Sequence, residues 1–175
     1  MLPVSDEMKN RRIKVIVYIA VCLIPIVLRN TPSFVIRPWL GAIAEALCMV
    51  FIMQTSRKSR PAAFAAALLA PALDYALGNM TPSLIAFYML GYFLSAVIWS
   101  GSKKSIVTAG LCGLALFLLR TAGYSAAYII HKELPACQAV LKVTRNAWFV
   151  GGIYIAAAVL FAAGVKISAA KRDAE

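Results

Sequence analysis

Residues 61–99 read PAAFAAALLAPALDYALGNMTPSLIAFYMLGYFLSAVIW, and this stretch decides the fold. Two apolar runs, 61–77 and 82–99, flank the four-residue break Gly78-Asn79-Met80-Thr81. At ~1.5 Å per residue, each run can cross a bilayer core of about 30 Å, given some tilt or local thinning. Gly and Asn permit a tight reversal, and Pro82 is suited to open the next helix. The stretch therefore predicts a transmembrane hairpin with almost no loop.

The composition of the whole chain indicates an integral membrane protein. Of its 175 residues, 62% are hydrophobic and 14% are charged, with a mean hydropathy of +0.79. Soluble domains are about 45–50% apolar and about 25% charged. The net charge of +11 does not indicate a nucleic-acid partner, because the basic residues lie in short segments between apolar runs. The four cysteines form no CxxC motif and three lie in apolar runs, which favours a role as small apolar side chains.

Working outward from the hairpin, four more apolar runs complete an all-α bundle of six transmembrane helices. The predicted spans are 13–28, 38–53, 61–77, 82–99, 105–130 and 146–165. Residues 1–14 form a basic leader, 15–165 a single transmembrane domain, and 166–175 a charged tail. The first run follows basic residues as in a signal peptide, but no small-x-small cleavage motif comes after it. We therefore expect a retained first span that also acts as the insertion signal.

The distribution of Lys and Arg predicts the orientation of the bundle. Twelve of the 18 basic residues fall in the leader, the tail and the segments that share their side, and five fall on the opposite side. Because cytoplasmic segments are enriched in Lys and Arg, both termini are expected in the cytoplasm. If the short first span only lies on the membrane surface, the count falls to five spans and the N-terminus loses this assignment.

Three ionisable residues lie inside the predicted spans: Glu45, Asp74 and Arg120. At ~1.5 Å per residue, Glu45 lies roughly 12 Å and Arg120 roughly 15 Å below the outer face, so the two are expected to pair. Asp74 lies roughly 5 Å deep and is expected to meet Arg37 or water. Arg29 and Arg37 are expected to reach the interface. Charges inside a membrane indicate either a functional site or a structural pair that fixes spans 2, 3 and 5.

Small residues recur at helical spacing in spans 3 to 6, which predicts close helix packing or, alternatively, a docking face for another membrane protein. They are Ala62, Ala66 and Ala70, Gly91 and Ser95, Ala109 and Gly113, and Gly152 and Ala156. Six tyrosines lie near span ends or on one helix face, where they either sit at the lipid headgroups or line a pocket. They are Tyr75, Tyr88, Tyr92, Tyr124, Tyr128 and Tyr154.

Catalysis has little support in the sequence. His131 is the only histidine, and the chain contains no HExxH, GxSxG or Gly-rich phosphate motif. No second acid close to Asp74 in sequence could share acid/base work. We therefore predict no catalytic residues, no metal ligands and no cofactor.

The order of features resembles the bacterial rod-shape protein family MreD. The residues that carry the resemblance are Arg37-Pro38, Asp74, the run Ala86-Phe87-Tyr88-Met89-Leu90-Gly91-Tyr92, and Asn146. The family often has Gly-Leu before its Asp and a Gly after the turn, where this chain has Ala70-Pro71 and Met80-Thr81. The resemblance implies a multi-pass scaffold of the bacterial cytoplasmic (inner) membrane in cell elongation and peptidoglycan synthesis. The implied partners are MreC, the actin-like MreB filament and wall-synthesis enzymes.

The layout is also similar to a second family, the substrate-binding S components of energy-coupling-factor vitamin transporters. That resemblance implies a six-helix arrangement that docks a transporter T component through small-residue faces. It also implies a vitamin site at the outer ends of spans 4 to 6, near residues 131–145. The candidate contacts in that reading are Tyr88, Tyr128, Asn146 and Trp148.

Overall fold

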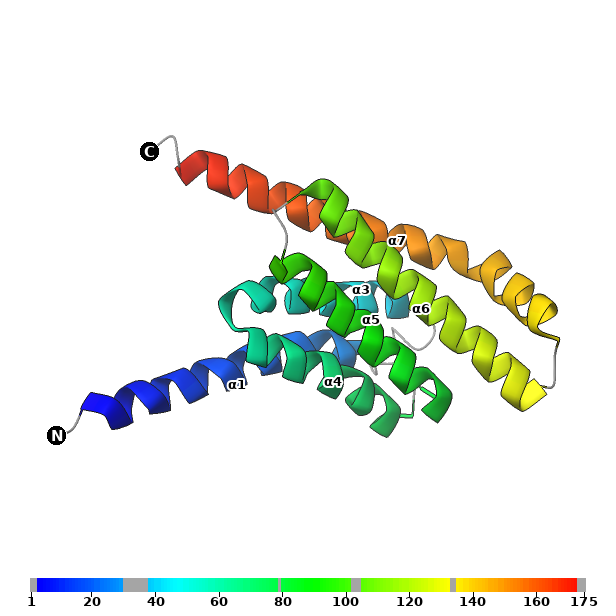
Figure 1. Cartoon of the computed structure of the whole chain (residues 1–175), viewed down its shortest axis with the longest axis horizontal. Helices are drawn as coiled ribbons and strands as arrows, with labels where there is room; N and C mark the ends of the chain where they lie inside the picture. The colour runs from blue at the N-terminus through cyan, green and yellow to red at the C-terminus, as the bar shows by residue number, and fades with distance from the viewer. Residues whose placement is uncertain (1–2, 30–37, 79, 102–104, 133–134, 173–175) are drawn as a thin grey trace.

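The computed structural model describes residues 3–29, 38–78, 80–101, 105–132 and 135–172, and helices make up nearly all of this part. The helices are α1 (Pro3–Arg29), α3 (Pro38–Lys58), α4 (Arg60–Ala76), α5 (Pro82–Gly101), α6 (Ile106–Lys132) and α7 (Ala136–Arg172). Successive helices run in opposite directions along the bundle, as Figure 1 shows. The N-terminal part of α1 and the C-terminal part of α7 both extend past the other helices at the same end of the molecule (Figure 1).

Four of these helices are long and apolar enough to cross a membrane. Their apolar segments are Trp39–Lys58, Pro82–Gly101, Ile106–His131 and Ala147–Ala170. This confirms the prediction of an all-helical chain suited to a multi-pass membrane protein. The other two helices differ in kind, because α4 has only 17 residues and α1 carries six charges among residues 6–14. The six-span count remains a prediction.

The predicted hairpin is formed by α4 and α5. Ser59 caps α4 by accepting a hydrogen bond from the Ala62 amide (3.4 Å), and Pro61 occupies the first turn. At the other end the Leu77 amide bonds to the Leu73 carbonyl (2.9 Å), and Gly78 follows with φ +81°. That left-handed conformation is favourable only for residues such as glycine, so Gly78 ends the helix here. The rings of Phe64 and Phe93 then pack at 4.8 Å between the two helices.

Two boundaries differ from the predicted ones. The leader is not separate from the first span, since α1 continues from Pro3 through Pro25 to Arg29. Residues 131–145 were predicted as one sizeable loop with part of it helical, and the helical part is larger than expected, since α6 runs to Lys132 and α7 begins at Ala136 and has 37 residues. Neither Gly nor Pro interrupts residues 136–150, so the helix extends through this polar stretch and also through residues 166–172.

Most of the small residues that were predicted as packing positions lie buried between helices. Ala62, Ala66 and Ala70 of α4 are fully buried, as are Ser95 and Ala109. A Cβ on Gly91 would lie 2.7 Å from Leu116, and one on Gly113 would lie 2.8 Å from the Tyr154 carbonyl, so α5, α6 and α7 approach closely at these glycines. The five buried residues and the two glycines therefore confirm the packing prediction for α4, α5 and α6.

The packing prediction was wrong for Gly152 and Ala156 as contacts within this chain. Both are exposed, and a Cβ on Gly152 would meet nothing within 4 Å. The buried face of α7 instead carries Gly151, Tyr154, Ala158 and Ala162. The spacing of small residues predicts that α7 has a packing face, but it does not predict which face that is. Gly151 and Gly152 are adjacent in sequence and point in different directions, so either could have been the buried one. The docking interpretation of Gly152 and Ala156 remains a prediction.

Candidate functional site

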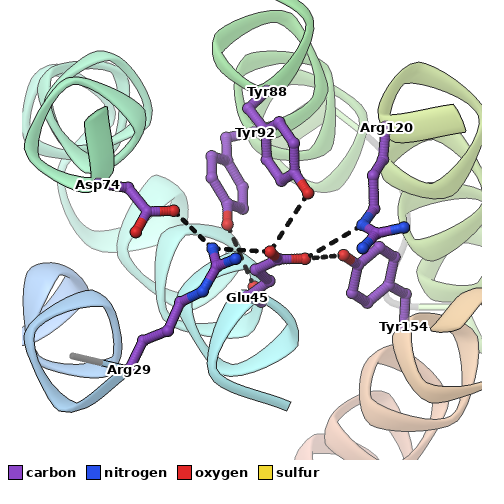
Figure 2. A network of polar contacts seen from close by, with 7 residues as sticks. All are labelled: Arg29, Glu45, Asp74, Tyr88, Tyr92, Arg120 and Tyr154. Carbon is purple, nitrogen blue, oxygen red and sulfur yellow. Dashed lines mark hydrogen bonds and ion pairs between the residues drawn. The ribbon is translucent and has the colours of Figure 1, made fainter. Parts of the chain in front are cut away.

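A buried polar network lies in the middle of the bundle, and each of the six described helices contributes a side chain to it (Figure 2). We call it the Glu45 network. Its members are Arg29 of α1, Glu45 of α3, Asp74 of α4, Tyr88 and Tyr92 of α5, Arg120 of α6 and Tyr154 of α7. Glu45 is only 1% exposed and Asp74 is fully buried, so both acids lie away from solvent. Such residues are stable in that position only when their charges are matched and their oxygens are hydrogen-bonded.

Three ion pairs match the charges. Arg29 Nη1 lies 2.8 Å from Glu45 Oε1 and 2.5 Å from Asp74 Oδ2, so one nitrogen joins both acids. On the other side, Arg120 Nε lies 3.4 Å from Glu45 Oε2, an ion pair without the alignment of a hydrogen bond. Two arginines and two acids leave the four-residue set electrically neutral. Neutrality makes the set compatible with the interior of a membrane protein.

Three tyrosines complete the coordination of Glu45. The Tyr88 hydroxyl donates to Glu45 Oε1 (3.2 Å), and the Tyr154 hydroxyl donates to Glu45 Oε2. The Tyr92 hydroxyl donates to the backbone carbonyl of Glu45 (3.4 Å). All three tyrosines are fully buried. Each carboxylate oxygen of Glu45 therefore has one cation and one hydroxyl beside it, which is the arrangement that a buried carboxylate needs.

The structure confirms the predicted pairing of Glu45 with Arg120. The partner predicted for Asp74 was Arg37, which lies outside the described residues, and the structure gives Asp74 a partner in Arg29. The prediction that Arg29 reaches the interface was wrong, because its side chain turns inward and is 16% exposed. Residue counting placed Glu45 and Asp74 at different depths in the membrane. The Arg29 side chain is long enough to contact both of them. The sequence did contain a signal for Arg29: the spans hold two acids and one cation, so one acid lacks a partner there.

Five of the six tyrosines fall into two groups, and Tyr75 belongs to neither. The headgroup interpretation was wrong for Tyr88, Tyr92 and Tyr154, which are fully buried in the network, whereas Tyr75 is 45% exposed. The second group, Tyr124 and Tyr128, lines a cleft of about 490 Å³ next to the network. We call it the Arg120 cleft. It is bounded by Trp39 of α3, by Arg120, Tyr124 and Tyr128 of α6, and by Lys142, Val143, Ala147, Phe149 and Val150 of α7.

Two cations in the cleft lie over tyrosine rings. The Arg120 guanidinium is 4.7 Å from the centroid of Tyr124, and Lys142 Nζ is 5.2 Å from the centroid of Tyr128. Of the four candidate ligand contacts, Tyr128 lines this cleft and Tyr88 belongs to the network. Trp148 is 76% exposed and is not among the lining residues. The backbone of Asn146 lies in α7, and its side chain lies outside the described part.

The arrangement indicates what the network can do. Both oxygens of Glu45 are already engaged, so the carboxylate is placed to join helices. Within the described ranges, no group of three or more His, Cys, Asp or Glu residues could hold a metal ion. The four apolar helices indicate a multi-pass membrane protein, and the ion pairs of the Glu45 network join its helices at the centre of the bundle. No protein-family model, curated protein or solved structure matches the chain.

Proposed function

We propose that this chain is a non-enzymatic membrane scaffold of the bacterial cell-elongation and peptidoglycan-synthesis machinery. The observation that carries the proposal is the Glu45 network, in which Glu45 contacts side chains of α1, α5, α6 and α7, and Arg29 joins α4 to it through Asp74. A scaffold needs a body that keeps its shape while its surface contacts other proteins. Ion pairs and hydrogen bonds that cross a bundle serve that purpose better than a site with free reactive groups.

The surface of the bundle supports the same role. Large apolar side chains such as Leu118 (56% exposed), Leu160 (71%) and Phe149 (61%) point outward from α6 and α7. They suit contact with lipid and with the helices of a membrane partner such as an MreC-like protein. The basic residues at the end where α1 begins and α7 ends suit contact with a cytoplasmic MreB-like filament.

In this proposal the chain crosses the bacterial cytoplasmic (inner) membrane six times and has both termini in the cytoplasm. The shared direction of the two ends in Figure 1 supports it. Fusions of alkaline phosphatase and green fluorescent protein to residues 1 and 175 test this topology. We expect fluorescence without phosphatase activity at both ends. Phosphatase activity at one end and fluorescence at the other would rule out an even number of spans.

Co-purification tests the scaffold role. The tagged chain, extracted in mild detergent from a rod-shaped bacterium that carries it, is expected to enrich an MreC-like protein and wall-synthesis enzymes. The same tag on an unrelated six-span protein serves as the control. Depletion of the chain should also turn rods into spheres. Rods that keep their shape, together with a purification that enriches no wall-synthesis protein, would contradict the proposal.

The Arg120 cleft favours a second candidate, the solute-binding S component of an energy-coupling-factor transporter. Its 490 Å³ volume and its tyrosines are suited to a small molecule. The same purification distinguishes the two candidates, because an S component is expected to retain a small molecule and a transporter T component. Mass spectrometry of the purified sample reads out both.

A further inference from the structure

The charges of the described residues around the Arg120 cleft do not cancel. Arg29, Arg120, Glu45 and Asp74 form a neutral set. Lys142 adds one positive charge at the cleft, and among the described residues that line it there is no acid. A cation beside a low-dielectric wall favours a compensating negative charge. One bound anion would therefore balance this region.

Arg120 has donors left over for such an anion. Its Nε faces Glu45 Oε2, and no contact of its two terminal nitrogens with another polar group is found within the described ranges. Figure 2 shows one of these nitrogens directed away from Glu45. A guanidinium carries five N–H donors in a planar fork, which fits the oxygens of a carboxylate or phosphate. The side chain is 16% exposed, so these donors can be reached.

The two cations are also held in position. Tyr124 lies under the Arg120 guanidinium, and Tyr128 lies under the Lys142 ammonium. Such contacts restrict long side chains and reduce the entropy lost when a ligand binds. Trp39, Val143 and Val150 add apolar wall to the same cleft. The volume of about 490 Å³ is within the range of about 300–1,000 Å³ that is common for ligand sites.

We propose that the Arg120 cleft binds a molecule with one carboxylate or phosphate group and an apolar or aromatic body. The anionic group lies between Arg120 and Lys142, and the body lies against Tyr124, Tyr128 and Trp39. A lipid headgroup and a free organic acid share this chemistry. The proposal goes beyond the scaffold role and does not depend on it, because it rests on the cleft alone.

Thermal unfolding of the purified chain in a neutral detergent tests the site. The probes are sodium benzoate, inorganic phosphate, and mixed micelles with phosphatidylglycerol or with phosphatidylcholine, all at constant ionic strength. At least one anionic probe is expected to raise the melting temperature in a saturable way, and phosphatidylcholine should have no effect. A rise with phosphatidylglycerol alone assigns a lipid headgroup, and a rise with benzoate or phosphate assigns a soluble anion.

A matched pair of variants on α7 locates the binding. Lys142→Gln is expected to weaken the apparent affinity about fivefold, since it removes one exposed cation from the cleft. Arg145→Gln removes an exposed cation one turn along the same helix and outside the cleft lining, and should leave the affinity unchanged. Both residues are exposed, so both variants should fold. No saturable shift with any anionic probe, or an equal loss in the two variants, would overturn the proposal.

Discussion

Glu45→Ala is expected to lower the free energy of unfolding by about 3–5 kcal/mol, the usual cost when one partner of a buried ion pair is removed. The substitution leaves Arg29 and Arg120 with only Asp74, so one positive charge becomes uncompensated inside the bundle. It also leaves the Tyr88 and Tyr154 hydroxyls without the acceptor they have now. Equilibrium unfolding in detergent, followed by circular dichroism, measures the loss.

The control for this variant is Gln54→Ala on the same helix. Gln54 is exposed and belongs to no part of the network, so its replacement is expected to change the stability by less than about 0.5 kcal/mol. If Glu45→Ala and Gln54→Ala lost equal stability, Glu45 would not hold the helices together. The scaffold proposal would then lose the observation that carries it.

A double-mutant cycle separates charge balance from packing. Glu45→Gln alone leaves a net charge of +1 in the four-residue set, and Arg120→Gln alone leaves −1, but the double variant leaves Arg29 paired with Asp74. The double variant is therefore expected to lose less stability than the sum of the single losses, by about 1–3 kcal/mol. Additive losses would show that Glu45 and Arg120 do not interact.

The sequence contained the helical hairpin in a form that can be read directly. The apolar runs, the Gly-Asn break and Pro82 are local signals, and local signals determine where α4 ends and α5 begins. The period of the small residues was also readable, and it correctly identified Gly91, Ser95, Ala109 and Gly113 as packing positions. The face that α7 turns inward depends on its neighbours, which explains the wrong assignment of Gly152 and Ala156.

The Glu45 network was only partly predictable for a similar reason. Depth along a helix follows from residue counting, and this was enough to pair Glu45 with Arg120. Counting ignores the reach of a side chain, so Arg29 at the end of α1 was placed at the interface although its guanidinium reaches both acids. The tyrosines have the same ambiguity, because an apolar ring with one hydroxyl suits either a lipid interface or a buried acceptor. Whether a given tyrosine lies at the lipid interface or in the core depends on whether a buried acceptor such as Glu45 lies beside it.

Gly113→Ala is expected to destabilise the bundle by about 1–3 kcal/mol, the usual cost of overpacking a tight interface. A Cβ at this position would lie 2.8 Å from the Tyr154 carbonyl oxygen and 2.9 Å from Ile155 Cα and N. These are backbone atoms of a helix, so no side chain can rotate away, and α6 and α7 must separate. Separation would also draw the Tyr154 hydroxyl away from Glu45.

Gly110→Ala, one turn earlier on the same helix, is the matched control. A Cβ there meets nothing within 4 Å, so this change is expected to be neutral or to stabilise by up to about 1 kcal/mol through helix propensity. Combining Gly113→Ala with Tyr154→Phe tests the link to the network, because the two losses should not add if helix separation already breaks the Tyr154–Glu45 hydrogen bond. Equal melting temperatures for Gly113→Ala and Gly110→Ala would contradict the close approach of α6 and α7, since only a tight interface distinguishes the two glycines.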